Sequence, residues 1–105
     1  MAASVWFVYM ILTDKGRLYT GIATDVARRL REHQDVAGGV ANARGAKYFR
    51  SQTPMQVVYV EAFADRPQAL RRERLIKGMT AVQKRRLCAE QAADVPERAN
   101  PALID

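Results

Sequence analysis

Three short runs of the chain have the hydrophobic pattern of β-strands. Residues 5–12 are aromatic and β-branched with apolar side chains at both parities, which is typical of a central strand covered on both faces. Residues 13–16 have turn composition, with Gly16 able to adopt a positive φ, so residues 17–22 are expected to return as the second strand of a hairpin. Residues 55–63 predict a third strand.

Segments with polar and apolar residues at helical spacing lie between these predicted strands and after the last one. Thr24 is a candidate N-cap, so the first helix is expected over residues 25–34. Residues 41–51 fit either a loop or a short helix that carries basic groups. Asp65 can cap a second long helix, which is expected to run to about Met79.

The last helix and the tail complete the expected fold. Thr80 and Gln83 have the spacing of a capping box, so a third helix is expected to begin there and to end before Pro96. The order β-β-α-β-α-α predicts an α+β fold, with a three-stranded antiparallel sheet flanked by helices. We expect a single domain over residues 1–94 and a flexible C-terminal tail over residues 95–105.

Composition and charge narrow the class of protein. Of the 105 residues 49% are apolar, enough for one core, and no apolar run approaches the roughly 20 residues of a membrane span. We expect no signal peptide and no membrane partner. Cys88 is the single cysteine and has no internal disulfide partner, which favours a cytoplasmic location. The net charge of +6, from 17 basic and 11 acidic residues, favours nucleic acid or an acidic surface as partner.

Ionisable side chains occupy positions where the first helix should bury apolar ones. The row that starts at Val26 continues with Arg29, Leu30 and His33. Taken alone, this row fits an Arg29 side chain that extends into solvent and a His33 that interacts with the helix dipole.

The second helix has a similar row, which consists of Ala69, Arg72, Glu73 and Ile76. Taken alone, it fits surface pairing among Arg72, Glu73 and Lys77, since exposed pairs of this kind are common and worth only about 0.3–0.5 kcal/mol. The spacing by itself therefore does not identify Glu73 as a metal ligand.

Two tyrosines and a glycine in the predicted hairpin could complete a site with these side chains. Tyr9 and Tyr19 are packing residues by default, but a hairpin that turns at residues 14–16 brings them near one another. Gly21 leaves space beside that face of the sheet. Two phenols, a guanidinium, an imidazole and a carboxylate suit phosphodiester chemistry, which needs an oxygen ligand for Mg²⁺, a cation and a proton acceptor.

The order of these residues resembles the GIY-YIG endonuclease superfamily. The matching segments are Phe7-Val8-Tyr9, Tyr19-Thr20-Gly21, residues 25–33 (Asp-Val-Ala-Arg-Arg-Leu-Arg-Glu-His) and residues 70–77 (Leu-Arg-Arg-Glu-Arg-Leu-Ile-Lys). The chain length and the segment Gly45-Ala46-Lys47-Tyr48 resemble the small stand-alone bacterial members. Many family nucleases carry an asparagine in a C-terminal motif; Asn100 lies in the expected tail and is a poor candidate for it.

The resemblance implies a role for each matching residue. Tyr9 and Tyr19 match the two motif tyrosines, of which one or both act as general base or position the water, and Gly21 matches the motif glycine. Arg29 matches the arginine that stabilises the transition-state charge, and His33 matches a histidine found one turn later. Glu73 matches the carboxylate that binds one divalent metal, Mg²⁺ with Mn²⁺ as a substitute.

Basic residues outside this set form two groups. Arg44, Lys47 and Arg50 are interleaved with Tyr48 and Phe49, either of which could stack on a base or belong to the core. The second group consists of Arg71, Arg72, Arg74, Lys77, Lys84, Arg85 and Arg86. Taken alone these charges fit ordinary solubility, but beside a nuclease-like site they are expected to contact the DNA backbone.

The sequence thus predicts a metal-dependent endonuclease that hydrolyses phosphodiester bonds in DNA with weak sequence specificity. The alternative is a non-catalytic nucleic-acid-binding module that retains the nuclease fold. A protein-interaction adaptor that uses the basic surface is a third class, which leaves the ordered polar set unexplained.

Overall fold

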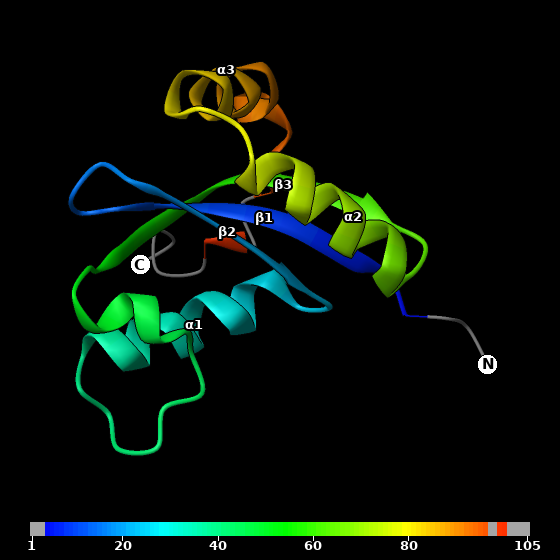
Figure 1. The fold of residues 1–105 in the computed structure, drawn as a ribbon. Helices are drawn as coiled ribbons and strands as arrows, with labels where there is room; N and C mark the ends of the chain where they lie inside the picture. Colours follow the sequence, from blue (N-terminus) through cyan, green and yellow to red (C-terminus); the bar gives the residue numbers. More distant parts are fainter. Residues whose placement is uncertain (1–3, 97–98, 101–105) are drawn as a thin grey trace.

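The fold has the predicted element order, with a sheet between helices on both of its faces (Figure 1). A computed structural model describes residues 4–96, 99 and 100. The elements are β1 (Trp6–Thr13), β2 (Leu18–Ala23), α1 (Val26–Ala37), the 3₁₀ turn η1 (Lys47–Arg50), β3 (Pro54–Phe63), α2 (Arg66–Lys77), α3 (Ala81–Gln91) and the 3₁₀ turn η2 (Ala92–Asp94). The α+β class and the order β-β-α-β-α-α are therefore confirmed. Within the described residues, no helix is long and apolar enough to cross a membrane.

The central strand is β1, as its apolar residues at both parities predicted. The antiparallel sheet has the order β2-β1-β3. Tyr9 and Ile11 pack into a cluster with α1, whereas Val8 and Met10 pack into a second cluster with α2. Each face of β1 therefore has its own core, because successive side chains of a strand point to opposite sides.

The helix boundaries follow from their caps. The first helix is capped by Asp25 and not by Thr24, because the Asp25 carboxylate accepts a hydrogen bond from the Arg28 N–H at 3.0 Å. The helix also continues to Ala37, three residues beyond the expected end. The predicted capping box of α3 is present, with the side chains and backbone N–H groups of Thr80 and Gln83 bonded to each other.

Residues 38–46 form a loop that returns along α1 and ends in η1. Gly45 lies so close to α1 that a Cβ atom there would overlap the backbone of Glu32 and the Cα of His33. This close approach brings the Ala46 N–H within 3.0 Å of His33 Nδ1, to which it donates a hydrogen bond. Residues 41–51 are therefore a loop followed by one short basic helical turn.

The described part of the C-terminal segment packs on the sheet, which differs from the loose tail that we expected. Ala99 and Asn100 are buried. The Asn100 side chain accepts a hydrogen bond from the Val57 N–H and donates one to the Val57 carbonyl at 3.0 Å, so it occupies the edge of β3 as a neighbouring strand would. A domain boundary at residue 94 stays a prediction, and residues 97–98 and 101–105 lie outside the described residues.

The close approach at Gly45 predicts a specific loss of stability. In Gly45→Ala the new methyl group meets backbone atoms of α1 that cannot rotate away, so we expect the free energy of unfolding in urea to fall by about 1–3 kcal/mol. Gly38→Ala is the matched control, because Gly38 has a φ of −81° and a Cβ there would make ordinary contacts. We expect Gly38→Ala to leave stability unchanged or to raise it by about 0.4–1 kcal/mol. Equal losses in both variants would contradict this interpretation.

Candidate active site

Tyr9 is the buried centre of the candidate site. It lies on β1 directly opposite Gly21 of β2, and its side chain is 1% exposed. A Cβ atom at position 21 would lie 2.5 Å from the Tyr9 hydroxyl oxygen, so only glycine leaves room for the phenol there. The sheet register therefore explains why a tyrosine and a glycine occur together in this hairpin.

His33 connects Tyr9 to the loop that follows α1. The imidazole is fully buried, with Nε2 2.8 Å from the Tyr9 hydroxyl oxygen and Nδ1 accepting from the Ala46 N–H. Burial, together with the smaller effect of the nearby Arg29 charge, lowers the pKa of His33 to about 4. The ring is therefore neutral at pH 7. Since Nδ1 is an acceptor, the single ring proton lies on Nε2 and is donated to Tyr9.

This tautomer determines what His33 can do for Tyr9. The imidazole donates to the phenol oxygen, so it does not accept the Tyr9 proton through this hydrogen bond. A donor directed at the oxygen favours the ionised phenolate over the neutral phenol. The opposing effects are larger, because burial and the neighbouring Tyr19 raise the pKa of Tyr9 well above its ordinary value, while Arg29 lowers it.

Arg29 lies at the edge of the same cluster. Its Nη1 donates to Glu32 at 3.1 Å and to the Arg44 carbonyl at 2.9 Å, so the guanidinium is held between α1 and the following loop. Burial lowers the pKa of Arg29. The Glu32 hydrogen bond and the Tyr9 phenol raise this pKa, and together they outweigh burial, so the net shift is upward. The side chain therefore stays a cation beside Tyr9 and Tyr19.

Tyr19 forms one side of an aromatic group around His33. Its ring centroid is 5.2 Å from His33, 5.2 Å from Tyr48 and 4.8 Å from Phe49. Burial raises the pKa of Tyr19, whereas Arg29 lowers it. Phe49 is completely buried and belongs to the core, while Tyr48 is half-buried, so Tyr48 and not Phe49 can present a ring to solvent.

Glu73 lies on α2, which packs against β1 and β2. Its side chain is 15% exposed, and its negative charge contributes to the raised pKa of both Tyr9 and Tyr19. Lys77 Nζ lies 3.5 Å from Glu73, as the surface pairing predicted. Arg72 does not join that pair: its Nε contacts Glu61 of β3 at 2.9 Å instead, because the helix turns it toward the sheet.

The residues present fit a single Mg²⁺ ion held by Glu73. Within the described part of the chain, no group of three or more His, Cys, Asp and Glu side chains could hold a metal. Mg²⁺ does not need such a group, because it commonly binds through one or two carboxylates together with water and phosphate oxygens. The partly buried carboxylate of Glu73 is the acidic side chain whose charge acts on both tyrosines.

The structure brings Tyr9, Tyr19, Gly21, Arg29 and His33 together, with Glu73 close by. Lys47 and Arg50 lie exposed on η1, and exposed Arg44 contacts Arg29 through its carbonyl. The sequence reading missed the backbone N–H of Ala46 as the partner of His33. The glycine at position 45 was a signal for close backbone approach, but no local pattern identified the helix that it approaches.

Comparison with known proteins supports the resemblance found in the sequence. The family described as GIY-YIG catalytic domain matches residues 5–86. The chain is 44% identical to a UPF0213 protein of Desulfotalea psychrophila (78% of this chain, 69% of the relative) and 39% identical to one of Cupriavidus necator (92% and 98%). The solution NMR structure of a UPF0213 protein from Bacillus halodurans is similar, with a TM-score of 0.52 and 32% identity over 90% of this chain and 92% of that one.

The environment of His33 predicts a pH-dependent stability. The folded-state pKa of about 4 lies below the unfolded value of about 6.5, so the unfolded chain takes up the proton first. Stability is therefore complete above pH 6.5 and falls by up to about 3 kcal/mol as the pH drops to 4. His33 is the single histidine, so unfolding of wild type and His33→Gln in urea across this range isolates its contribution.

The expected result is a steeper loss of stability toward pH 4 in wild type than in His33→Gln, with the two curves parallel above pH 7. Nitrogen NMR of the imidazole should also show a protonated Nε2 and an unprotonated Nδ1. Parallel curves over the whole range, or the opposite tautomer, would be inconsistent with the hydrogen bonds to Tyr9 and Ala46.

Proposed function

Since the chain belongs to the GIY-YIG catalytic-domain family, we propose that it is a metal-dependent endonuclease that hydrolyses phosphodiester bonds in DNA with weak sequence specificity. The observation that supports this most is the meeting of two tyrosines, a neutral histidine and a cationic arginine with the carboxylate of Glu73. Packing does not require this set, because it places several polar groups where β1 and α1 could bury apolar ones. The single cysteine fits action in the cytoplasm.

In this proposal Tyr9 accepts or directs the proton of the attacking water. Mg²⁺ bound by Glu73, or Mn²⁺ in its place, would supply positive charge for the water and the phosphate. Burial keeps the pKa of Tyr9 above its ordinary value, so ionisation needs additional stabilisation of the phenolate. The N–H of His33 and the charge of Arg29 provide part of it, and Tyr19 is the second phenol beside the reacting group.

Arg29 stabilises the charge that develops on the phosphoryl oxygens. Its guanidinium is held by Glu32 and the Arg44 carbonyl through Nη1 and lies beside the Tyr9 phenol. A planar, permanently charged fork of this kind matches phosphate oxygens. Exposed Arg44, Lys47 and Arg50 follow on the adjoining loop and η1, where they would contact the DNA backbone.

A non-catalytic nucleic-acid-binding module is the second candidate. The observation that favours it is the raised pKa of Tyr9, which leaves this group protonated at neutral pH unless further positive charge arrives. The basic side chains would bind DNA equally well in that case. Cleavage assays on variants of the site separate the two candidates.

Loss of Arg29 or Glu73 should abolish cleavage and preserve binding. For Arg29→Ala we expect the rate of metal-dependent strand cleavage to fall about 10²–10³-fold, as for the loss of one transition-state donor, and for Glu73→Gln a fall of at least that size. DNA affinity should stay within a few-fold, since the other cations are untouched. Arg28→Ala and Glu90→Gln, at exposed positions on α1 and α3, are the matched controls and should cleave like wild type.

If purified wild type cleaves no DNA form while both site variants bind DNA like wild type, the binding-module candidate replaces the endonuclease. Equal losses in the site variants and their controls would show that the side chains of the cluster have no special part in cleavage. Circular dichroism spectra confirm that each variant folds.

Glu73 should be the sole direct protein ligand of the divalent ion. Crystals soaked in Mn²⁺ are expected to show anomalous density at the Glu73 carboxylate, and Mg²⁺ should bind there at about 2.0–2.1 Å with water in its remaining positions. Glu73→Gln crystals soaked in the same way should lack this density. Metal held mainly by other side chains, or absent from Glu73 in wild type, would contradict the assignment.

A further inference from the structure

Two stretches of the chain carry basic residues and no acidic residue. Residues 36–60 carry three basic side chains, Arg44, Lys47 and Arg50. Residues 74–89 carry five, Arg74, Lys77, Lys84, Arg85 and Arg86. The first stretch holds the DNA contacts proposed above. The second includes α3, which has no place in the candidate active site.

The turn of the β1–β2 hairpin meets the start of α3 in a small cavity. The cavity has a volume of about 180 Å³ and is lined by Gly16, Arg17, Leu18, Ala81, Lys84 and Arg85. Arg17 and Lys84 lie 67 positions apart in the sequence, so the fold, and no local run of charge, brings these cations together. We call this cavity the hairpin notch.

The three cations of the hairpin notch have no acidic partner among the described residues. The ion pairs among the described residues lie outside the hairpin notch and involve Arg29, Arg72 and Lys77. Asp14 is the acidic residue of the hairpin turn, but its carboxylate accepts from the Thr53 N–H at 2.9 Å, on the side of β3. Like charges gathered around one cavity repel each other, and an anion bound between them removes that cost.

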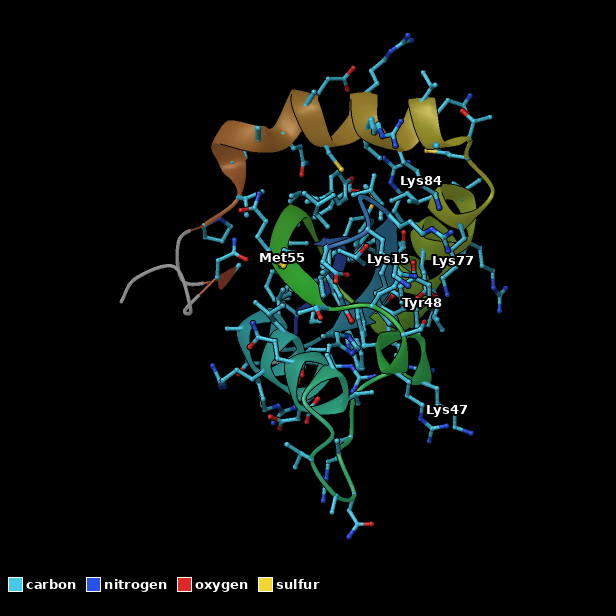
Figure 2. All side chains as sticks on the ribbon, turned by 90° about the vertical axis from the view of Figure 1, so that its left-hand side faces the viewer. Lys15, Lys47, Tyr48, Met55, Lys77 and Lys84 are labelled. Carbon is cyan, nitrogen blue, oxygen red and sulfur yellow. The ribbon has the colours of Figure 1, made fainter. Side chains whose placement is uncertain are left out.

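The hairpin notch lies on the same face as the candidate active site. Figure 2 shows Lys84, Lys15 and Lys77, then Tyr48, then Lys47, following one another along one side of the molecule. Lys77 pairs with Glu73 and Tyr48 packs on Tyr19, so the active-site cluster lies between the two basic ends. A polyanion that crosses this face would therefore meet cations on both sides of the reacting group.

We propose that the hairpin notch binds a backbone phosphate of the DNA, on the opposite side of the scissile bond from Arg44, Lys47 and Arg50. This inference rests on the proposed function for the identity of the anion. The molecule is 39 Å in its longest dimension, which corresponds to about 11–12 base pairs at roughly 3.4 Å each. A duplex that crosses the molecule is therefore covered over at most about one turn, and contact on both sides of the cluster would fix which bond lies at the site.

The salt dependence of DNA binding tests the notch. The variant Arg17→Gln/Arg85→Gln removes two exposed arginine charges that line the hairpin notch. The control Arg28→Gln/Arg31→Gln removes two exposed arginine charges on α1, which does not line the hairpin notch. Affinity for a fluorescent 20-base-pair duplex is measured in chelator over a salt series, so that no cleavage occurs. We expect the notch variant to lower the slope of log affinity against log salt by about 0.9, the value for the loss of one phosphate contact. The control slope should stay near that of wild type.

A variant that keeps the charge separates phosphate contact from damage to the fold. Arg17→Lys/Arg85→Lys should retain most of the wild-type slope, because lysine also binds phosphate as a point charge. Equal effects in the notch variant and the α1 control, or no effect in either, would overturn the inference. Cleavage with Mg²⁺ is measured separately. If the protein never cleaves DNA but the notch variant specifically lowers the slope, the hairpin notch is supported and the nuclease is refuted. If the protein cleaves DNA and the slope is unaffected, the nuclease is supported and the hairpin notch is refuted.

Discussion

The buried imidazole of His33 holds together the three parts of the chain that form the candidate site. One ring nitrogen donates to Tyr9 on β1, and the other accepts from the backbone N–H of Ala46, where the loop passes close to α1 at Gly45. Both bonds can exist only while the ring is neutral, and burial lowers the pKa enough to keep it so. His33, which the sequence alone allowed as a residue that interacts with the helix dipole, thus positions the Tyr9 phenol and the loop that carries the basic residues.

Glu73 approaches this assembly from a separate layer. α2 lies on the face of the sheet opposite α1, and the contact between Arg72 and Glu61 at 2.9 Å ties the helix to β3. Glu73 is the next residue on this helix, and its charge acts on Tyr9 and Tyr19. The proposed metal site therefore depends on how α2 packs on the sheet, whereas Tyr9 and His33 are held together on the α1 side.

Patterns that are local in the sequence predicted the fold well, and contacts that are distant in the sequence did not follow from it. The two apolar faces of β1 and the Thr80 capping box depend on neighbouring residues, and both are confirmed. The burial of Asn100 against Val57 depends on a contact across 43 positions. No local pattern indicates this contact, and the Pro-rich composition around Asn100 predicted a flexible segment instead. The candidate site residues came from a resemblance, and their roles stay predictions. Spacing alone could not show that His33 is a donor to Tyr9.

Strand cleavage by the wild-type protein tests the central claim most directly. Supercoiled plasmid, single-stranded DNA and a branched duplex are each incubated with the protein in Mg²⁺ or in chelator, and the products are separated under denaturing conditions. The proposal predicts new strand ends on at least one form in Mg²⁺ and none in chelator, with no DNA attached to protein. Intact DNA in every Mg²⁺ reaction, or equal cleavage in chelator, would contradict it.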